Sequence, residues 1–379
     1  CAALQNAHTV RVTPAEGETQ VSRSVEAGVF EPVETELAID ADDIVLATGS
    51  RPLALPGNPF AGALIDSTQA LELNTLPSSA VIIGAGAVAL EFASLWNAAG
   101  CEVTLLIRKD RVLSTWERRA SMTLTRELKR RGVNVIARTA VDRVDTGANL
   151  GATVHYRQGD SDEDRTAYGE VVLAAIGRVP NTDADWFRSS GLKLDERGYV
   201  TVDGYGRTNL DGVWALGDIT PGHALAHRAF EQGITIAEKI AGADPKPVID
   251  DTVPQVVFSF PEAASVGLTL DQAKAREDVV EPKETAYPML SNARMLMSGE
   301  GGSMTVVSGA FANNPDMQVV LGVHIVSPIA SDLIAEAEQL VGNRVPLADA
   351  ARLIHPHPTF SETLGEALLK ADGRPLHTR

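Results

Sequence analysis

The sequence has few cysteines, few aromatic residues and no long apolar run, and each shortage excludes a class of protein. Two cysteines in 379 residues cannot form the disulfide framework of a small secreted scaffold, so we expect a cytoplasmic protein. No run reaches the roughly 18 apolar residues of a membrane span, so we expect no membrane association. Aromatic residues make up only 5%, which favours close helix-on-sheet packing of small apolar side chains.

Basic residues are also outnumbered. Lys and Arg total 33 against 50 Asp and Glu, which gives a formal net charge of −17. Binding to nucleic acid requires a basic surface that neutralises phosphates, so we expect no nucleic acid partner. The length predicts two to four domains. The chain begins with Cys1 rather than Met, and we interpret it as a fragment or a processed product.

Hydrophobic patterning predicts a chain that mixes helices and strands. Residues 1–50 are expected to be β-rich, with a turn at 17–20, and residues 51–79 to be mainly loop. A β-α-β unit is expected from residue 80, with a hairpin tip at 158–165. The predicted strands are 80–83, 101–107, 133–138, 171–176 and a strand pair within 200–218. The predicted helices are 116–131, 224–240, 269–276, 331–341, 347–354 and 361–370.

The strongest local motif is Gly84-x-Gly86-x-x-Ala89, between a predicted strand and a predicted helix. Gly84 permits a tight turn, Gly86 lets the backbone approach a pyrophosphate, and Ala89 lets the helix lie on the sheet. The helix N-terminus would then offer free N–H groups and a positive dipole end to the phosphates. The alternative is a tight strand-to-helix turn without a ligand. The strand-helix-strand context favours the dinucleotide.

The choice between NAD and NADP depends on the end of the next strand. An NAD site usually has an acidic residue there, which accepts from the ribose hydroxyls, but this sequence has Ile107 followed by Arg108 and Lys109. Those cations, with Arg111, suit the 2′-phosphate of NADP. The alternative is a solvated basic loop, and we leave the nucleotide open as NAD(P).

Five motifs, in order, resemble one family. They are Ala47-Thr-Gly-Ser-Arg-Pro52, Gly84 to Glu91, Ala175-Ile-Gly-Arg-Val-Pro-Asn181, Thr208 to Gly217-Asp218, and His355-Pro-His-Pro-Thr-Phe-Ser-Glu362. Together they resemble the class I pyridine nucleotide-disulfide oxidoreductases over about residues 4–370. The closing His-x-His-Pro-Thr-x-Ser-Glu run is most similar to the dihydrolipoyl dehydrogenases of that family, whereas Ile107-Arg108 is more similar to the NADPH-using glutathione reductases.

The resemblance implies an α/β fold with a Rossmann-like, three-layer ββα nucleotide-binding domain, a remnant of an FAD-binding domain and a C-terminal α+β dimerisation domain. It implies the following boundaries: 1–76 and 201–249 for the FAD-binding parts, 77–200 for the NAD(P)-binding domain, and 250–379 for the dimerisation domain. The family also carries a Gly-rich FAD unit and a Cys-x-x-x-x-Cys redox disulfide. This sequence has neither, and we expect them upstream of Cys1.

The resemblance also assigns roles to single residues. His357 would manage thiol protons beside the disulfide of a partner subunit, with Glu362 as its orienting carboxylate, because a thiolate and not a thiol attacks a disulfide. Local sequence also permits a helix capping box, in which Glu362 reaches back to the Thr359 N–H. His355 is expected to support this loop, and a cis bond is expected at His357-Pro358.

The remaining assignments concern the two cofactors. Asp218 would accept from a ribityl hydroxyl of FAD, although it could also be an ordinary turn residue. Glu91 would lie near the nicotinamide, although without its family partner it could be a solvated helix residue. The full set of cofactor-binding candidates is Gly84, Gly86, Ala89, Glu91, Arg108, Lys109, Gly177, Thr48, Gly49, Gly217, Asp218, Ala226 and His227.

These assignments predict a homodimeric, dihydrolipoyl dehydrogenase-like enzyme that moves two electrons between a dithiol or disulfide substrate, FAD and NAD(P). Lipoyl groups of a 2-oxoacid dehydrogenase complex are one expected substrate. The first alternative is an NADPH-dependent reductase of low-molecular-weight disulfides or quinones. The second is an inactive NAD(P)-binding and dimerisation fragment. No metal site is expected, because the histidines and cysteines lack metal-ligand spacing.

Overall fold

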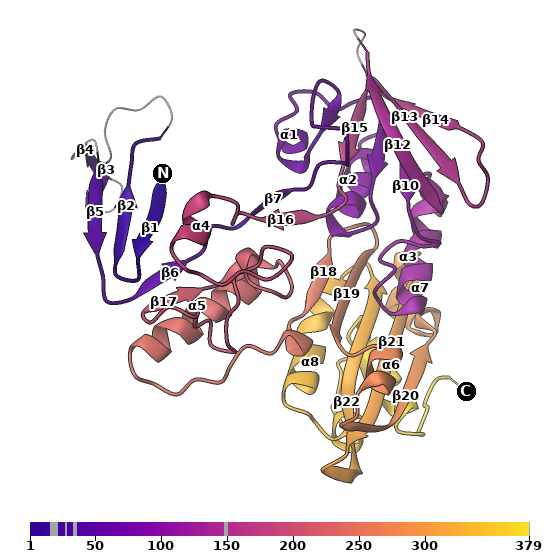
Figure 1. Ribbon diagram of the computed structural model, residues 1–379. Helices are drawn as coiled ribbons and strands as arrows, with labels where there is room; N and C mark the ends of the chain where they lie inside the picture. The colour runs from indigo at the N-terminus through magenta and orange to yellow at the C-terminus, as the bar shows by residue number, and fades with distance from the viewer. Residues whose placement is uncertain (16–21, 27–28, 33–35, 148–150, 379) are drawn as a thin grey trace. The chain divides into compact units, whose positions relative to one another are not determined.

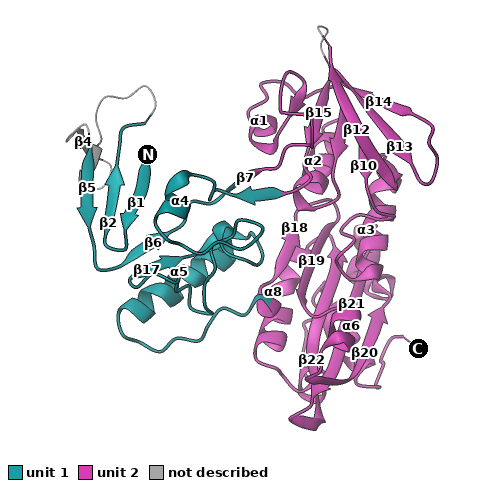
Figure 2. Ribbon diagram, viewed as in Figure 1, with its two compact units in different colours: residues 1–51, 178–250 teal, residues 52–177, 251–379 magenta. Residues whose placement is uncertain are grey.

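A computed structural model describes residues 1–15, 22–26, 29–32, 36–147 and 151–378. The chain divides into two compact units, each formed by two separate stretches of sequence (Figure 2). The first unit comprises residues 1–51 and 178–250, and the second comprises residues 52–177 and 251–379. The turn predicted at residues 17–20 lies outside the described residues. The four domain boundaries given above stay a prediction.

The first unit is built from short strands and one long helix (Figure 1). Its antiparallel sheet has the order β1 (Ala2–Asn6), β2 (Thr9–Val12), β5 (Leu37–Asp40). The strands β3 (Ser22–Glu26) and β4 (Val29–Pro32) pair with each other, β7 (Ser50–Pro52) pairs with β16 (Arg178–Pro180), and β6 (Ile44–Leu46) runs parallel to β17 (Val213–Ala215). The helices are α4 (Asp185–Ser189), the 3-10 turns η1 (Gly217–Ile219) and η2 (Asp250–Thr252), and α5 (Ala226–Ile240).

The N-terminal half of the second unit has three layers. Its parallel sheet has the order β11 (Asn134–Ala137), β10 (Glu102–Ile107), β9 (Ser79–Ile83), β15 (Val171–Ala174), β8 (Leu64–Ile65). The helices α2 (Ala87–Ala98) and α3 (Arg118–Arg130) bury apolar side chains against one face. The antiparallel sheet β12 (Thr139–Thr146), β13 (Ala152–Gln158), β14 (Arg165–Gly169) covers the other face. The short helix α1 (Ser67–Leu71) precedes β9.

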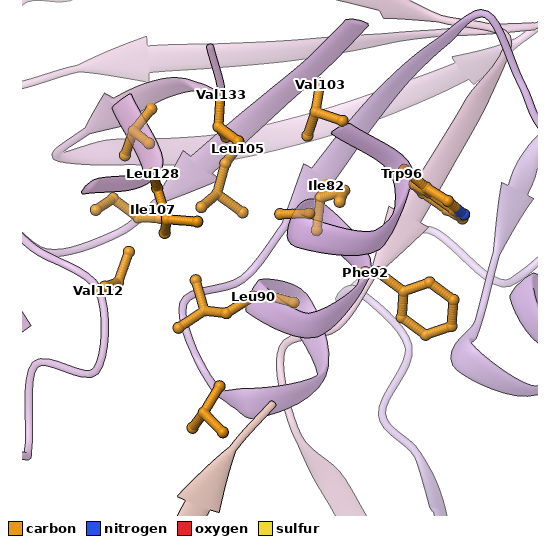
Figure 3. Close-up of a cluster of buried hydrophobic side chains, with 14 of the residues drawn as sticks. Ile82, Leu90, Phe92, Trp96, Val103, Leu105, Ile107, Val112, Leu128 and Val133 are labelled. Carbon is orange, nitrogen blue, oxygen red and sulfur yellow. The ribbon is translucent and has the colours of Figure 1, made fainter. Parts of the chain in front are cut away.

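The alternation of side chains along the parallel strands explains these layers. Ile82, Leu105 and Ile107 face the helices, where they meet Leu90 and Leu128 in a dry cluster (Figure 3). The neighbouring residues on the same strands face the opposite sheet, because successive strand side chains point to opposite faces. Fully buried aliphatic strands of this kind are characteristic of parallel sheets covered on both sides.

The C-terminal half of the second unit is an antiparallel sheet with helices. The strand order is β18 (Gln255–Val257), β19 (Glu262–Gly267), β22 (Asn314–Ser327), β21 (Ser303–Phe311), β20 (Val279–Tyr287). The helices α8 (Ala330–Gly342), α9 (Leu347–Ala350) and α10 (Glu362–Ala371) bury their apolar faces against it. The shorter helices are α6 (Leu270–Ala275), η3 (Met289–Ser291) and α7 (Ala293–Ser298). The predicted fold class is therefore confirmed.

Two secondary-structure predictions were wrong. The expected strand pair at 200–218 is one strand, β17, with a lone bridge between Arg207 and Trp214. There the Asp203 carboxylate accepts from the Tyr205 and Arg207 N–H groups, which forms a turn in place of a ladder. The helix expected at 347–354 is one turn long and ends at Ala350. The stretch 51–79 is mainly loop, as expected, and it also contains the short helix α1, which a capping box at Asp66 begins.

Candidate functional site

The turn after β9 is built around a glycine that no other residue can replace without strain. Gly84 has a φ of +146°, a conformation that side-chain-bearing residues rarely adopt. A Cβ placed there would lie 2.2 Å from the Ala175 carbonyl oxygen and 3.2 Å from the Ala89 Cβ. Ala89 is itself fully buried against the sheet. The close approach of β9, β15 and α2 therefore depends on Gly84 and Ala89 being small.

Gly86 has a different environment two residues later. It is the N-cap of α2, its φ of −91° is ordinary, and a Cβ placed there would meet no atom within 4 Å. No side chain caps this helix end. The first backbone N–H groups of an α-helix have no intrahelical acceptor, so those of α2 are available to a ligand. This geometry fits an anionic group such as a pyrophosphate.

The neighbouring strand ends lie at the point where the strand order of the sheet reverses. β10 lies on one side of β9 and β15 on the other, which is where open α/β sheets bind ligands. Gly177 follows β15 with a φ of +148° and open space beside it. Arg108 and Lys109 follow β10 and are exposed. Arg111, which was also predicted to suit a 2′-phosphate, forms an ion pair with Asp110 at 3.0 Å.

Glu91 is on α2, one turn after the Gly-rich segment. Its Oε1 accepts a hydrogen bond from the Phe258 N–H at 3.0 Å. The neighbouring helix residue Ser94 accepts from the Phe260 N–H at 3.1 Å. Glu91 is therefore half-buried and engaged with the segment after β18, and it is not an ordinary solvated helix residue in this structure.

The first unit gathers three of the sequence motifs around Asp218. The Ser50 hydroxyl donates to the Asp218 carboxylate, and the Arg178 guanidinium donates to both the Ser50 hydroxyl and the Ser50 carbonyl, each at 2.7 Å. Thr48 and Asn181 form a reciprocal pair, in which each side chain donates to the other's backbone carbonyl at 2.9 Å. Ser50, Arg178 and Asn181 lie within the family motifs, but we predicted no role for these three residues from the sequence.

The remaining flavin candidates lie on backbone turns in the same unit. Gly49 and Gly217 both have a φ of +70°, and Gly217 is buried and donates its N–H to the Gln232 side chain at 2.8 Å. Ala226 and His227 are the first two residues of α5, whose N-terminus has no side-chain cap. The glycine turns and the uncapped helix end fit a phosphate- and hydroxyl-bearing cofactor such as FAD.

The C-terminal half of the second unit contains the pair formed by His357 and Glu362. The His357 Nδ1 lies 2.9 Å from one Glu362 oxygen, and the other Glu362 oxygen accepts the Thr359 N–H at 2.8 Å. The thiol-base pair and the reach back to Thr359, which the sequence presented as alternatives, therefore occur together. The His357 side chain is 74% exposed, and that of Glu362 is 21% exposed.

Glu362 is held in its ionised form. Burial opposes ionisation, but the hydrogen bonds from the Thr359 N–H and from His357 outweigh it and lower the pKa of the Glu362 carboxyl. An ionised carboxylate only accepts, so His357 donates through Nδ1, which leaves Nε2 as the nitrogen that can take a proton. The peptide bond between His357 and Pro358 is cis, as expected.

Further contacts that the sequence did not predict hold the loop that carries His357. The Asn292 side chain donates to the Thr359 carbonyl at 3.1 Å, and the Thr359 hydroxyl donates to the Pro356 carbonyl at 2.7 Å. Asn292 comes from the N-cap of α7, about 65 residues earlier in the chain, so no local pattern could have indicated it.

Neither cysteine resembles a redox pair. Cys1 is exposed, whereas Cys101 is buried at the start of β10. Burial, followed by the nearby carboxylates of Glu170 and Glu102, raises the pKa of the Cys101 thiol to about 11. Only a thiolate exchanges with disulfides, so a protonated and buried Cys101 is unreactive. We therefore interpret Cys101 as a small residue of the hydrophobic core. Among the described residues, no helix is long and apolar enough to cross a membrane, and no cluster of three metal-ligating side chains occurs.

The chain is similar to proteins of one family over both units. The profile described as pyridine nucleotide-disulphide oxidoreductase matches residues 2–233, and the profile of that family's dimerisation domain matches residues 253–368. The dihydrolipoyl dehydrogenase of Cupriavidus necator is 36% identical over 342 residues, which cover 89% of this chain and 70% of that protein. That of Geobacillus stearothermophilus is 37% identical over 339 residues, which cover 88% and 69%. The solved structure of LpdA from Mycobacterium tuberculosis superposes with a TM-score of 0.80 at 28% identity, covering 96% of this chain and 73% of LpdA.

Proposed function

Because this chain belongs to the pyridine nucleotide-disulphide oxidoreductase family, we propose that it moves two electrons between a dithiol or disulfide substrate and NAD(P), in the manner of a dihydrolipoyl dehydrogenase. The observation that carries this proposal is the exposed His357 ring, which the ionised Glu362 orients through Nδ1. An imidazole held in this way takes a proton from a thiol at Nε2, and the carboxylate stabilises the resulting cation.

The proposed reaction is the oxidation of a substrate dithiol to a disulfide with reduction of NAD(P)⁺ to NAD(P)H. Two thiol protons and two electrons leave the dithiol, the nicotinamide takes a hydride, and one proton goes to solvent through His357. Bound FAD supplies the two-electron relay between sulfur and nicotinamide. The residues of the protein orient the reactants and hold the proton. Lipoyl groups of a 2-oxoacid dehydrogenase complex are the substrates we propose.

Each cofactor is assigned to residues whose geometry fits it. We propose that the α2 N-terminus, with Gly84, Gly86 and Ala89, binds the nucleotide pyrophosphate, and that Glu91 and Gly177 lie beside the rest of the nucleotide. The hydroxyl-binding role of Asp218 in the FAD site rests on its carboxylate, which accepts from the Ser50 hydroxyl, and Ser50 is in turn held by Arg178. Thr48, Gly49, Gly217, Ala226 and His227 form the rest of that proposed site.

The protein is proposed to act as a homodimer. The match to a dimerisation domain over residues 253–368 suggests this state. The same domain carries His357, whose exposed ring would serve the disulfide site of the partner subunit. The chain covers 70% and 69% of the length of the two curated relatives described above.

Arg108 and Lys109 favour NADP and, with it, the first alternative function. An exposed guanidinium beside an ammonium suits a 2′-phosphate better than ribose hydroxyls. An NADPH-dependent reductase of small disulfides or quinones would use the same scaffold. Initial rates with NADH and NADPH against lipoamide, glutathione disulfide and a quinone separate these functions. Faster turnover of lipoamide than of the other two supports the dihydrolipoyl dehydrogenase proposal, and the reverse order refutes it.

The cysteines favour the second alternative, an inactive nucleotide-binding and dimerisation fragment. The sequence contains no second cysteine near Cys101, and the thiol of Cys101 is buried. A visible absorption spectrum of the purified chain distinguishes the two. A flavin band together with dithiol-dependent turnover supports the enzyme, whereas a colourless protein that binds NAD(P)H without turnover supports the fragment.

A further inference from the structure

A second histidine, His355, lies at the base of the loop that carries His357. Its side chain is only 9% exposed. The Nε2 of the His355 ring lies 2.9 Å from the Glu336 carboxylate of α8. The Leu353 carbonyl also accepts from the His355 ring. Unlike His357, this ring cannot reach a substrate, so any part it takes in the reaction is indirect.

The His355 ring rests against α10 at a position where the helix has no side chain. A Cβ placed on Gly365 would lie 2.4 Å from the ring Nδ1 and 2.8 Å from the ring Cε1. Glycine weakens the interior of a helix, yet Gly365 is buried in the middle of α10. The close approach of the His355 ring gives a physical reason for a glycine at this position.

The same helix carries Glu362, three residues before Gly365. His355 therefore links α8, α10 and the His357 loop within one unit. The loop is held at its far end by the hydrogen bond from the Thr359 N–H to Glu362. We propose that His355, held between Glu336 and Gly365 of α10, is a positioning residue that keeps the His357 ring within hydrogen-bond reach of Glu362. This inference rests on the proposed function of His357 as a thiol base.

A positive charge on His355 also favours the hydrogen bond between His357 and Glu362. The hydrogen bond to Glu336 outweighs burial and raises the pKa of His355, with smaller contributions from the Leu353 carbonyl and from Glu362. The charged groups that face His355 are thus Glu336 from α8 and Glu362 from α10. A cationic His355 in turn helps to lower the pKa of Glu362, after the effects of the Thr359 N–H and His357.

The chain offers a matched control on the same helix. Glu366, one turn after Glu362, lies 2.8 Å from the Nδ1 of His377. This pair has the same chemistry, but His377 comes from the C-terminal segment and bonds to Glu366 rather than to the 355–361 loop. Its side chain is 65% exposed. Loss of His377 should therefore leave the geometry of His357 and Glu362 unchanged.

The first test is a spectroscopic readout that needs no turnover. In ¹⁵N-histidine-labelled chain, the ring nitrogen shifts of His357 report whether Nδ1 carries the proton, as donation to Glu362 requires. We expect wild type and His377→Gln to give this tautomer. His355→Ala and Gly365→Ala should give mixed tautomers, and His355→Gln, which can still donate to Glu336, should restore part of the Nδ1–H signal.

The second test is kinetic. We expect kcat for dithiol-dependent NAD(P) reduction to fall about 10-fold or more in His355→Ala and Gly365→Ala, with KM for the nucleotide within about twofold. His377→Gln should stay within about twofold of wild type. If Gly365→Ala or His355→Ala does not fold, as judged by circular dichroism, Glu336→Ala replaces it, because it removes the acceptor of the His355 ring while leaving the ring in place.

The outcomes separate the two proposals. Wild-type chain without turnover refutes the proposed function, while the tautomer measurement still decides the positioning role. An unchanged Nδ1–H tautomer of His357 in the folded His355→Ala, Gly365→Ala or Glu336→Ala variants overturns the positioning role, whatever the turnover. A change of equal size in His377→Gln also overturns it, because the effect would then be general to α10.

Discussion

The two glycines of the turn after β9 give opposite predictions for the same substitution. In Gly84→Ala, the new methyl group would lie 2.2 Å from the Ala175 carbonyl oxygen, in a backbone with a φ of +146°. The disfavoured conformation costs about 1–3 kcal/mol and the overpacking about another 1–3 kcal/mol. The sum, about 2–6 kcal/mol, lowers the melting temperature by roughly 3–8 °C in a chain of 379 residues, since the unfolding entropy is about 2.1 cal/mol/K per residue.

In Gly86→Ala, the methyl group enters open space from an ordinary backbone conformation. The loss of a good N-cap residue and the reduced freedom of the unfolded chain nearly cancel, so stability should change by less than about 1 kcal/mol. The methyl group occupies the space through which we propose that a phosphate approaches. Nucleotide affinity should therefore fall about tenfold or more, which is about 1.4 kcal/mol.

Two measurements on the same preparations test this pair. Thermal unfolding followed by circular dichroism gives the stability, and titration with NADH and NADPH followed by nucleotide fluorescence gives the affinity. Gly86→Ala should melt with wild type but bind weakly, whereas Gly84→Ala should melt well below both. A Gly86→Ala protein that binds both nucleotides with wild-type affinity, or a Gly84→Ala protein with wild-type stability, would refute the reasoning.

Three further predictions concern other charged or reactive groups. At pH 7 a thiol with a pKa of about 11 is only about one part in ten thousand thiolate, so Cys101 should alkylate at least about 100-fold more slowly than Cys1 in peptide-mapping mass spectrometry. Replacing both Arg108 and Lys109 by Ser should weaken NADPH binding about tenfold and leave NADH binding within about twofold, and equal losses for the two nucleotides would contradict the 2′-phosphate assignment. Folding lowers the pKa of Glu362, so the ionised Glu362 stabilises the folded chain at pH values above its pKa in the unfolded chain, about 4.3. This stabilisation is lost as the pH falls through the pKa of Glu362 in the folded chain. The free energy of unfolding of wild type, measured with urea, should thus fall below about pH 4.3. Glu362→Gln should remove part of that pH dependence.

The sequence predicted the parts of the fold that are governed by local patterns. The β9–α2–β10 unit follows from an apolar strand, a Gly-rich turn and a helix that ends before Gly100, all of which are adjacent in the chain. The helix over 361–370 was predicted to within one residue at each end. The capping box that begins α1 at Asp66 was also present in the sequence, and we overlooked it among the prolines of that stretch.

The candidate site was less predictable where it depends on contacts between distant residues. Ser50 and Arg178 are 128 residues apart, and the pairing of β7 with β16 brings them together, so that Arg178 donates to Ser50 and Ser50 donates to Asp218. The clamp on His355 likewise joins Glu336 and Gly365 from two helices. No periodicity or spacing encodes such contacts. A family resemblance transfers residue roles but not the surrounding hydrogen bonds.

The most direct test of the account is the effect of His357→Gln on dithiol-dependent NAD(P) reduction, measured alongside nucleotide affinity. General base catalysis contributes about 100-fold or more, so kcat should fall by at least that factor while the dissociation constant for the nucleotide stays within about twofold. Turnover by His357→Gln at the wild-type rate would contradict the assignment of His357 as the thiol base.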